Sequence, residues 1–387
     1  MSKAALRVGI FGTFDVENYG DLLFPLLAEM ELKQRLGNVE IVPFSYHAKS
    51  PPEWPYAVTS LTELPDLIEG LDAALIGGGH LIRFDTSIAP GYGPPSPNLH
   101  HPTAYWLVPA LMAGQAGIPV AWNAPGALGD VPDWARPLLE LALGCSEYVA
   151  LRDMDSCRAM SPFAAVPPTR VPDTAFGIAR LLAASGGVDS HRKGTSAYRD
   201  RYIVVQATWG LAPFLDMVRR MPDELRDCRF VVVPIGPINL DHVELLGEPL
   251  PGADYPAASN DPLSLAALIA DSVGVVGTSL HLSITALASG VPVFRPATHL
   301  GDKYAPLADF DAVHSFEADV DPQWFAARLG RRPSPLARAA EAELAVHWDR
   351  IASVVSADKR TAVPRAYFDF WQALPSRLES RATPTKG

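Results

Sequence analysis

The chain has 387 residues, of which 48% are hydrophobic and 19% charged, which is enough apolar material for two domains with buried cores. Its formal net charge of −11 argues against nucleic acid as a partner, because phosphate binding needs a basic surface. Three cysteines without C-x-x-C spacing, and the lack of a signal-peptide run or of an apolar run of about 18 residues, are typical of a cytoplasmic protein.

Short apolar runs that end in glycine or a polar turn alternate with helical segments along the chain. Each run is too short for a buried helix and is typical of a strand covered on both faces. In chain order the runs are LRVGIFG, DAALIGGG, IPVAWNAPG, EYVALRD, YIVVQATWG, RFVVVPIG, VGVVGTS and VPVF. Helices are expected over residues 21–36, 103–116, 132–143, 262–270, 281–289 and 335–355. This alternation predicts parallel sheets made of right-handed βαβ units.

A polar, glycine-rich segment between Ala183 and Arg201, ASGGVDSHRKGTSAYRDR, interrupts the alternation and is typical of a linker. The sequence therefore predicts an α/β fold with two Rossmann-like, doubly wound parallel-sheet domains, residues 1–190 and 200–358, facing a ligand-binding cleft. Residues 359–387 contain YFDFWQALPSRL, which is aromatic on one face. We expect a helix there that packs back on the N-terminal domain, with a membrane-surface or partner helix as the alternative.

The first candidate site residues are Asn18, Tyr19, Gly20 and Asp21, where the first strand gives way to the first helix. Asn18 and Asp21 are suited to capping that helix, whose N-terminus favours acidic side chains. In the alternative interpretation, backbone amides and the Tyr19 ring face the cleft and touch a ligand. The segment has no Walker lysine and no G-x-G-x-x-G motif, so a nucleotide fingerprint is absent.

A second glycine turn, IGGGHLIRFD over residues 76–85, follows a later apolar run. Glycines directly after a strand let a ligand approach the backbone amides, which makes Gly78 and Gly79 binding candidates. His80 and Arg83 follow them and are candidates for holding an anion.

Two further candidates precede the linker. Arg152, at the end of the strand in YVALRDMDS, is either half of a buried ion pair or a guanidinium that offers its fork to a phosphate or carboxylate. Asp173, in VPDTAF, is either a turn residue or a carboxylate that orients a histidine or a sugar hydroxyl. The residue types leave both alternatives open.

The most informative run is VGTSLHLSITALASGVPVF, over residues 276–294. A buried strand ends before Thr278 and Ser279, which are candidates for binding the substrate, and a helix begins with His281 in its first turn. The helix dipole disfavours a histidine cation there, so we expect a ligand-binding or acid–base role in the cleft. Lys303, in a loop after the next strand, either closes over an anion or stays solvated. No metal constellation is apparent, and the G-x-S-x-G spacing of a hydrolase nucleophile is absent.

Taken in order, these motifs resemble the polysaccharide pyruvyl transferase family. The family pattern has an N-Y-G-D segment, a G-G-G turn, an R-[DE]-x-x-S motif, a D-x-x-F segment, and an [RS]-[LF]-H motif followed by G-x-P. Here these read Asn18–Asp21, Gly77–Gly79, Arg152–Ser156, Asp173–Phe176, and Ser279–His281 with Gly290–Pro292. One departure is Ser279, because members with sugar-pyruvylating activity tend to carry arginine at that position.

The resemblance implies a GT-B-like fold and a reaction that moves pyruvate from phosphoenolpyruvate to two sugar hydroxyls as a ketal. The acceptor would be a cell-surface polysaccharide or its lipid-linked precursor, and phosphoenolpyruvate would be the donor substrate, with no cofactor. His281 fits the acid–base role and Arg152 the anion-binding role, with Lys303 or Arg83 as further cations. The N-terminal domain would take the acceptor, whose hydroxyls suit the turn at residues 18–21, and the C-terminal domain the donor.

Two other functions fit the same residues. A glycosyltransferase of this fold would bind a nucleotide sugar in its second domain. A non-catalytic relative would bind a glycan or a partner enzyme, and Ser279 is the main support for that alternative. Peripheral contact with the inner face of the membrane and a homo-oligomer are both compatible with the sequence.

Overall fold

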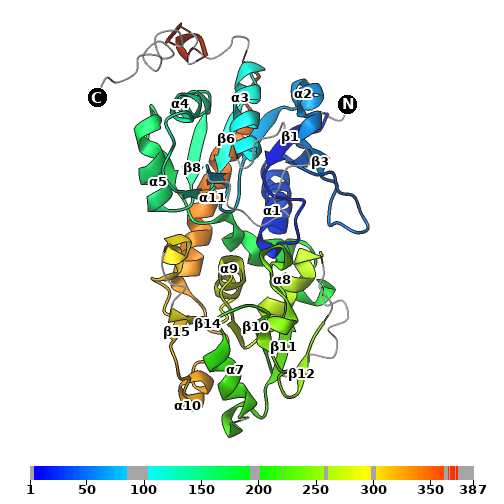
Figure 1. Ribbon diagram of the computed structural model, residues 1–387. Coiled ribbons are helices and arrows are strands. Elements are labelled where there is room, and N and C mark those ends of the chain that lie inside the picture. Colours follow the sequence, from blue (N-terminus) through cyan, green and yellow to red (C-terminus); the bar gives the residue numbers. More distant parts are fainter. Residues whose placement is uncertain are drawn as a thin grey trace, which may run out of the picture.

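The computed structural model describes residues 4–84, 103–191, 201–220, 222–256, 260–297 and 302–360, and, near the C-terminus, residues 365, 367–370 and 372–373. The chain forms two lobes, one above the other in Figure 1, and each lobe contains a parallel sheet flanked by helices. The prediction of two Rossmann-like parallel-sheet domains is therefore confirmed.

The first sheet has seven strands in the order β3-β2-β1-β4-β6-β8-β9, and each neighbouring pair is parallel. Its strands are β1 (Leu6–Phe11), β2 (Val39–Ser45), β3 (Thr59–Ser60), β4 (Ala73–Ile76), β6 (Val120–Asn123), β8 (Tyr148–Leu151) and β9 (Thr169–Arg170). The helices are α1 (Tyr19–Leu36), α2 (Leu64–Leu67), α3 (Leu107–Gln115), α4 (Arg136–Gly144), α5 (Met154–Met160) and α6 (Ile178–Ala184). A separate two-stranded sheet pairs β5 (Ile82–Arg83) with β7 (Ala127–Leu128).

The second sheet has six strands in the order β12-β11-β10-β13-β14-β15, again with parallel neighbours. Its strands are β10 (Tyr202–Gln206), β11 (Arg229–Val233), β12 (Ala253–Asp254), β13 (Gly274–Val276), β14 (Val293–Pro296) and β15 (Val313–Phe316). Its helices are α7 (Ala212–Arg219), α8 (Pro262–Asp271), α9 (Leu280–Ala288) and α10 (Pro322–Ala326), and the long helix α11 (Pro335–Val355) follows. In both sheets the strand order reverses beside the first strand of the domain, between β1 and β4 and between β10 and β13.

All eight apolar runs form strands, because each is buried on both faces of its sheet. The other strands are shorter or more mixed in composition. Strand β2, VEIVPFS, carries an exposed Glu40 and a proline within the run, which weaken its apolar signal. The helix expected over residues 103–116 begins with a 3-10 turn, Thr103–Tyr105, and becomes α-helical at Leu107.

Helix α11 has the bounds expected from the sequence, but it packs on the first domain, although the expected boundary assigns it to the second. It contacts β6, β8 and α1, and in Figure 1 it runs from the lower lobe into the upper one. The reason is an apolar stripe of Leu344, Trp348, Ile351 and Val355, which is buried in the core of the first lobe.

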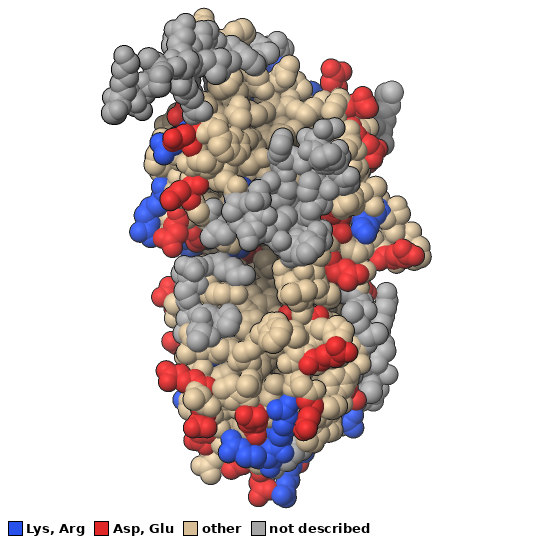
Figure 2. Space-filling model, in the orientation of Figure 1, with Lys and Arg blue, Asp and Glu red and all other residues tan. Residues whose placement is uncertain are grey.

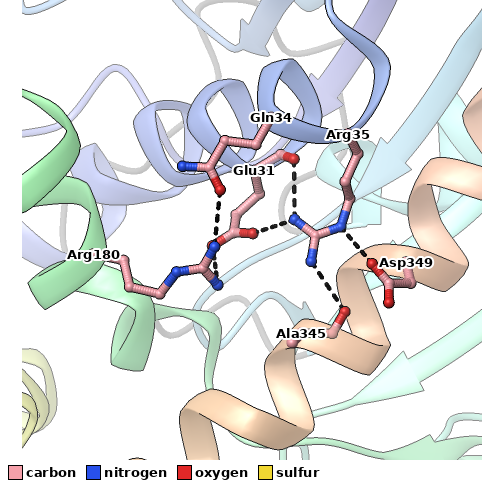
Figure 3. Close-up of polar contacts among 6 residues, drawn as sticks. All are labelled: Glu31, Gln34, Arg35, Arg180, Ala345 and Asp349. Atoms are coloured by element: carbon pink, nitrogen blue, oxygen red, sulfur yellow. Dashed lines mark hydrogen bonds and ion pairs between the residues drawn. The ribbon is translucent and has the colours of Figure 1, made fainter.

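Ionic contacts around the buried Glu31 also attach α11 and α6 to α1 (Figure 3). Glu31, whose side chain is only 1% exposed, lies 2.5 Å from Arg35 Nη1 and 3.1 Å from Arg180 Nη1. Arg35 also donates to Asp349 at 2.7 Å and to the carbonyl of Ala345 at 3.1 Å, both on α11. A buried carboxylate between two guanidinium groups ties three helices together at the back of the first domain.

Beyond α11 the chain stays on the first domain as far as it is described. The Arg360 amide donates to the carbonyl of Gly117 at 2.8 Å, and the Tyr367 hydroxyl donates to the carbonyl of Leu111 at 2.6 Å. Among the described helices, none is long and apolar enough to cross a bilayer. On the face in Figure 2, acidic and basic side chains are mixed, most densely at the end of the second lobe away from the first.

Candidate functional site

A cleft of about 370 Å³ lies between the two lobes. The residues that line it follow the strands beside both points of strand-order reversal, where ligands bind in open α/β sheets. Its polar and charged lining residues are Thr13, Asn18, Asp21, His80, Arg83, Tyr105 and Arg152 from the first domain, and Gln206, Thr208, Asn239, Asp241, Thr278, Ser279, His281 and Tyr304 from the second.

Asp173 joins the two predicted catalytic residues across the domain boundary. Its Oδ2 atom lies 3.5 Å from Arg152 Nη1 and 3.6 Å from His281 Nε2, and Oδ1 accepts the amide of Ala175 at 3.0 Å. Burial raises the pKa of Asp173, but the charges of His281 and Arg152 and the Ala175 amide outweigh burial and bring the net pKa below its usual value. A charged Asp173 thus faces both an arginine and a histidine.

His281 stands in the first turn of α9, two residues after the Ser279 N-cap, whose hydroxyl accepts the amide of Leu282 at 3.3 Å. The edge of the ring meets Phe24, with ring centroids 5.5 Å apart. A Cβ atom at Gly20 would lie 1.8 Å from His281 Nδ1, so only glycine leaves room for the imidazole there. The nearby carboxylate of Asp173 offsets the unfavourable effect of the helix dipole on an imidazolium.

Arg152 follows β8, and its side chain is only 2% exposed. Its Nε atom lies 3.4 Å from Asp153 Oδ2, and its guanidinium packs against Gly126, where a Cβ would come within 2.5 Å of Nε. Within the described ranges, Nη2 is buried and makes no hydrogen bond. The ion-pair interpretation of Arg152 is confirmed, because the guanidinium contacts Asp153 and Asp173. Arg152 also lines the cleft, and its binding of an anion stays a prediction.

The second-domain wall of the cleft is built around Gln206. Its Oε1 atom accepts the backbone amides of Thr278 and Ser279, each at 2.8 Å, and its Nε2 atom donates to Asp241 at 2.8 Å. Asp241 also accepts the amide of Gly236 at 2.9 Å, and burial raises the pKa of this carboxyl despite these hydrogen bonds. Thr278 and Ser279 are predicted substrate-binding residues, and their backbone amides are already engaged within the protein, although both residues line the cleft.

The residues of the turn at 18–21 have three different roles, which are to cap α1, to pack between the domains and to line the cleft. Asn18 caps α1 by accepting the Gly20 amide at 3.3 Å, and both Asn18 and Asp21 line the cleft. Tyr19 does not contact the cleft, contrary to the ligand-binding interpretation. Its side chain is buried, and its hydroxyl lies 2.7 Å from the Thr285 hydroxyl of α9, so it joins the two domains.

The glycine turn after β4 packs closely against side chains of helix α1. Gly78 and Gly79 have φ angles of +109° and +69°, which side chains rarely adopt. A Cβ at Gly78 would come within 2.4 Å of the Phe24 ring, and one at Gly79 within 3.0 Å of Asp21. The two glycines thus let the turn approach α1 closely, whereas His80 and Arg83, just beyond, line the cleft.

Lys303 lies in a 3-10 turn, Asp302–Leu307, but its side chain is outside the described residues. Sequence reasoning missed several polar residues of the cleft, namely Thr13, Tyr105, Gln206, Thr208, Asn239, Asp241 and Tyr304. Gln206 and Thr208 carried a usable signal, because they are polar residues at the end of an apolar run.

Within the described ranges, no group of three His, Cys, Asp or Glu side chains is placed to hold a metal ion.

Comparison with known proteins gives the family from a sequence model and the fold from solved structures. A family model described as polysaccharide pyruvyl transferase matches residues 18–295. The sequence matches none of the curated proteins. The fold is similar to that of UDP-GlcNAc 2-epimerase from Methanocaldococcus jannaschii, with TM-score 0.52 and 12% identity over 89% of this chain and 99% of that one. UDP-GlcNAc 2-epimerase from Neisseria meningitidis, bound to UDP-GlcNAc, gives TM-score 0.50 and 12% identity over 96% and 99%. At this identity the likeness shows the two-domain, GT-B-like fold.

Proposed function

The chain belongs to the polysaccharide pyruvyl transferase family, and from that premise we propose that it transfers pyruvate from phosphoenolpyruvate to a sugar. The product would be a ketal across two hydroxyls of a polysaccharide or its precursor. The observation that carries the proposal is the position of Asp173 Oδ2, which lies 3.5 Å from Arg152 and 3.6 Å from His281. One carboxylate thus links a cation suited to the donor with an imidazole suited to proton transfer.

The donor has a carboxylate and a phosphate, and both need positive partners. In our proposal Arg152 binds one of them through Nη2, the buried donor that has no hydrogen-bond partner among the described residues. Arg83 and His80, on the same wall of the cleft, are the candidates for the second anionic group. We place the anion against these side chains because Gln206 already occupies the Thr278 and Ser279 amides.

In the proposed reaction His281 donates a proton to C3 of the enol, and C2 acquires oxocarbenium character. Two hydroxyl oxygens of the sugar form bonds to C2, the bond from C2 to the phosphate oxygen breaks, and phosphate leaves. Of the two hydroxyl protons, one restores His281 and the other leaves with phosphate. Asp173 faces Nε2 and stabilises the imidazolium that donates the proton.

The acceptor would lie on the first-domain side of the cleft. Asn18 and Asp21 line this part of the wall and offer an amide and a carboxylate, groups that form hydrogen bonds with sugar hydroxyls. The overall acidity of the chain does not oppose a neutral sugar. The acidic turn and the cationic side chains then serve different substrates within one cleft.

A thermal-shift comparison tests the proposed donor. We expect phosphoenolpyruvate to raise the melting temperature of the wild type, with a smaller rise for inorganic phosphate and none for UDP- or GDP-sugars. Arg152→Met should melt at a lower temperature, because Asp173 loses a buried partner, and should lose the response to phosphoenolpyruvate. Stabilisation by a nucleotide sugar alone would contradict the proposal and favour a glycosyltransferase.

A further inference from the structure

Two buried side chains hold the turn that precedes His281 from opposite sides. On one side Gln206 Oε1 accepts the amides of Thr278 and Ser279. On the other, the guanidinium of Arg295 donates to the carbonyls of the same two residues, at 2.6 Å to Thr278 and 3.2 Å to Ser279. All four backbone polar groups of the turn are therefore bound to these two side chains.

Arg295 comes from the central strand β14 and is completely buried. Its Nη1 atom also donates to the Ser283 hydroxyl of α9 at 2.6 Å. The ring of Tyr304 lies 4.3 Å from the guanidinium carbon and lines the cleft on its other side. Burial lowers the pKa of Arg295 to about 10, which still leaves it charged at neutral pH. A buried charge of this kind is costly, so its fixed contacts suggest more than packing.

We propose that Gln206 and Arg295 are positioning residues for His281, acting together through the Thr278–Ser279 turn. His281 is two residues beyond Ser279, the N-cap of α9. The orientation of the Thr278–Ser279 turn therefore sets the direction in which α9 begins and the position of the imidazole. Arg295 also places a guanidinium next to Ser279, the position where the family pattern admits arginine. This inference rests on the proposed acid–base role of His281.

The physical basis is the cost of unpaired buried groups. Without Gln206, two amides of the turn lose their acceptor. Without Arg295, the Thr278 carbonyl loses its donor, and the Ser279 carbonyl keeps only its bonds from Ser283. The turn would relax to regain these bonds, and His281 would shift relative to Asp173. A displacement of about 1 Å at a reacting group can cost about 100-fold in rate.

We call the hydrogen bonds from Gln206 and Arg295 to the Thr278–Ser279 turn the clamp. Amide hydrogen exchange tests whether the clamp holds this turn, and it does not rely on any enzymatic activity. We would compare wild type with Gln206→Leu, Arg295→Met and the conservative Arg295→Lys, with Arg328→Met as the matched control. Arg328 also covers an aromatic ring, that of Trp324 at 4.7 Å, but it does not line the cleft. We expect faster exchange in the peptide containing residues 278–283 for the clamp variants alone. Unchanged exchange in folded Gln206→Leu and Arg295→Lys would overturn the clamp.

Kinetics with phosphoenolpyruvate test positioning. We expect kcat to fall about 100-fold in Gln206→Leu and Arg295→Lys, with the donor Kd changed less than about threefold. The double variant should lose little more than the worse single variant, because both residues act through one turn. Added guanidinium at millimolar concentration should restore part of the kcat of Arg295→Ala. Additive losses, or a raised Kd at constant kcat, would overturn the positioning role.

The two proposals fail in different ways. If the wild type neither binds nor turns over phosphoenolpyruvate, the proposed function fails, while the exchange data still decide whether the clamp exists. If the wild type turns over and the clamp variants equal Arg328→Met in rate, the positioning role fails and the proposed function stands.

Discussion

Asp173 is the residue on which the site depends most, because one of its oxygens lies near both Arg152 and His281. The sequence left its role open between a turn residue and a partner for histidine. The structure combines the two, since Oδ1 caps the turn at Ala175 while Oδ2 faces the cationic groups.

Asp173→Asn should separate these two roles. Asparagine keeps an oxygen for the Ala175 amide but removes the charge that stabilises an imidazolium. We expect kcat to fall by about 100-fold or more and the melting temperature to fall as well, because Arg152 and His281 lose the charge that pairs with them. Asp153→Asn is the matched control, because Asp153 contacts Arg152 but not His281. Equal losses in both variants would assign the effect to Arg152 and would contradict a role through His281.

Gly20→Ala tests the close packing of α1 against the imidazole. Alanine normally favours a helix over glycine, yet its methyl group would lie 1.8 Å from His281 Nδ1. We expect at least about a tenfold loss of kcat, because His281 must move away from Asp173. Gly70→Ala is the control, since a Cβ there meets only the Arg7 side chain, at 3.3 Å. An active Gly20→Ala enzyme would show that His281 tolerates displacement.

At the scale of elements, the buried strands were the part of the fold that the sequence predicted best, because each is a short apolar run that ends in glycine or a polar turn. Arg295 was missed because a single polar residue within such a run looks like an exposed position, whereas the position of Gln206 at the end of a run was a signal that could have been used. Tyr19 was expected near a ligand, but the sequence could not show that Thr285, 266 positions away, would be its partner. Contacts between domains depend on how the sheets meet, which local patterns do not specify.

Helix α11 should make the stability of the protein sensitive to acid. His347 on this helix lies 3.1 Å from both the Tyr148 hydroxyl and Asn123 Oδ1, and burial, followed by the charges of Arg35 and Arg350, lowers its pKa to about 3. The unfolded chain takes up a proton near pH 6.5, whereas the folded protein does not until about pH 3. The stabilisation is thus complete above about pH 6.5 and declines as the pH falls towards 3.

We expect the free energy of unfolding to fall by up to about 1.4 kcal/mol per pH unit from this histidine between about pH 6 and pH 4. His347→Gln, which keeps hydrogen-bonding groups but cannot titrate, should have a flatter dependence over this window. Urea unfolding at a series of pH values measures both slopes. The same slope in the variant would mean that other groups account for the acid sensitivity.

At the scale of the whole molecule, α1 contributes to both the site and the domain interface. Gly20 and Phe24 contact His281, the Tyr19 amide donates to the carbonyl of Ile235 at 2.9 Å, and the Tyr19 hydroxyl meets Thr285. The cleft is therefore formed by two sheets whose relative position the first turn of α1 helps to set.

Tyr19→Phe removes one hydrogen bond from that interface and leaves the buried Thr285 hydroxyl without this partner. We expect a loss of about 1–2 kcal/mol in the free energy of unfolding, measured with urea, and a modest fall in kcat. Tyr367→Phe, which loses a bond within the first domain alone, is the control for stability without effect on the cleft. A Tyr19→Phe enzyme with wild-type stability and kcat would show that this contact does not help to fix the cleft.

The central claim is that the cleft binds phosphoenolpyruvate through Arg152, and calorimetric titration tests it most directly. We predict saturable binding to the wild type and to Arg158→Met, which alters an exposed arginine on α5, and at least about a tenfold weaker Kd for folded Arg152→Met. Equal affinity in all three proteins, or no binding to the wild type, would contradict the account.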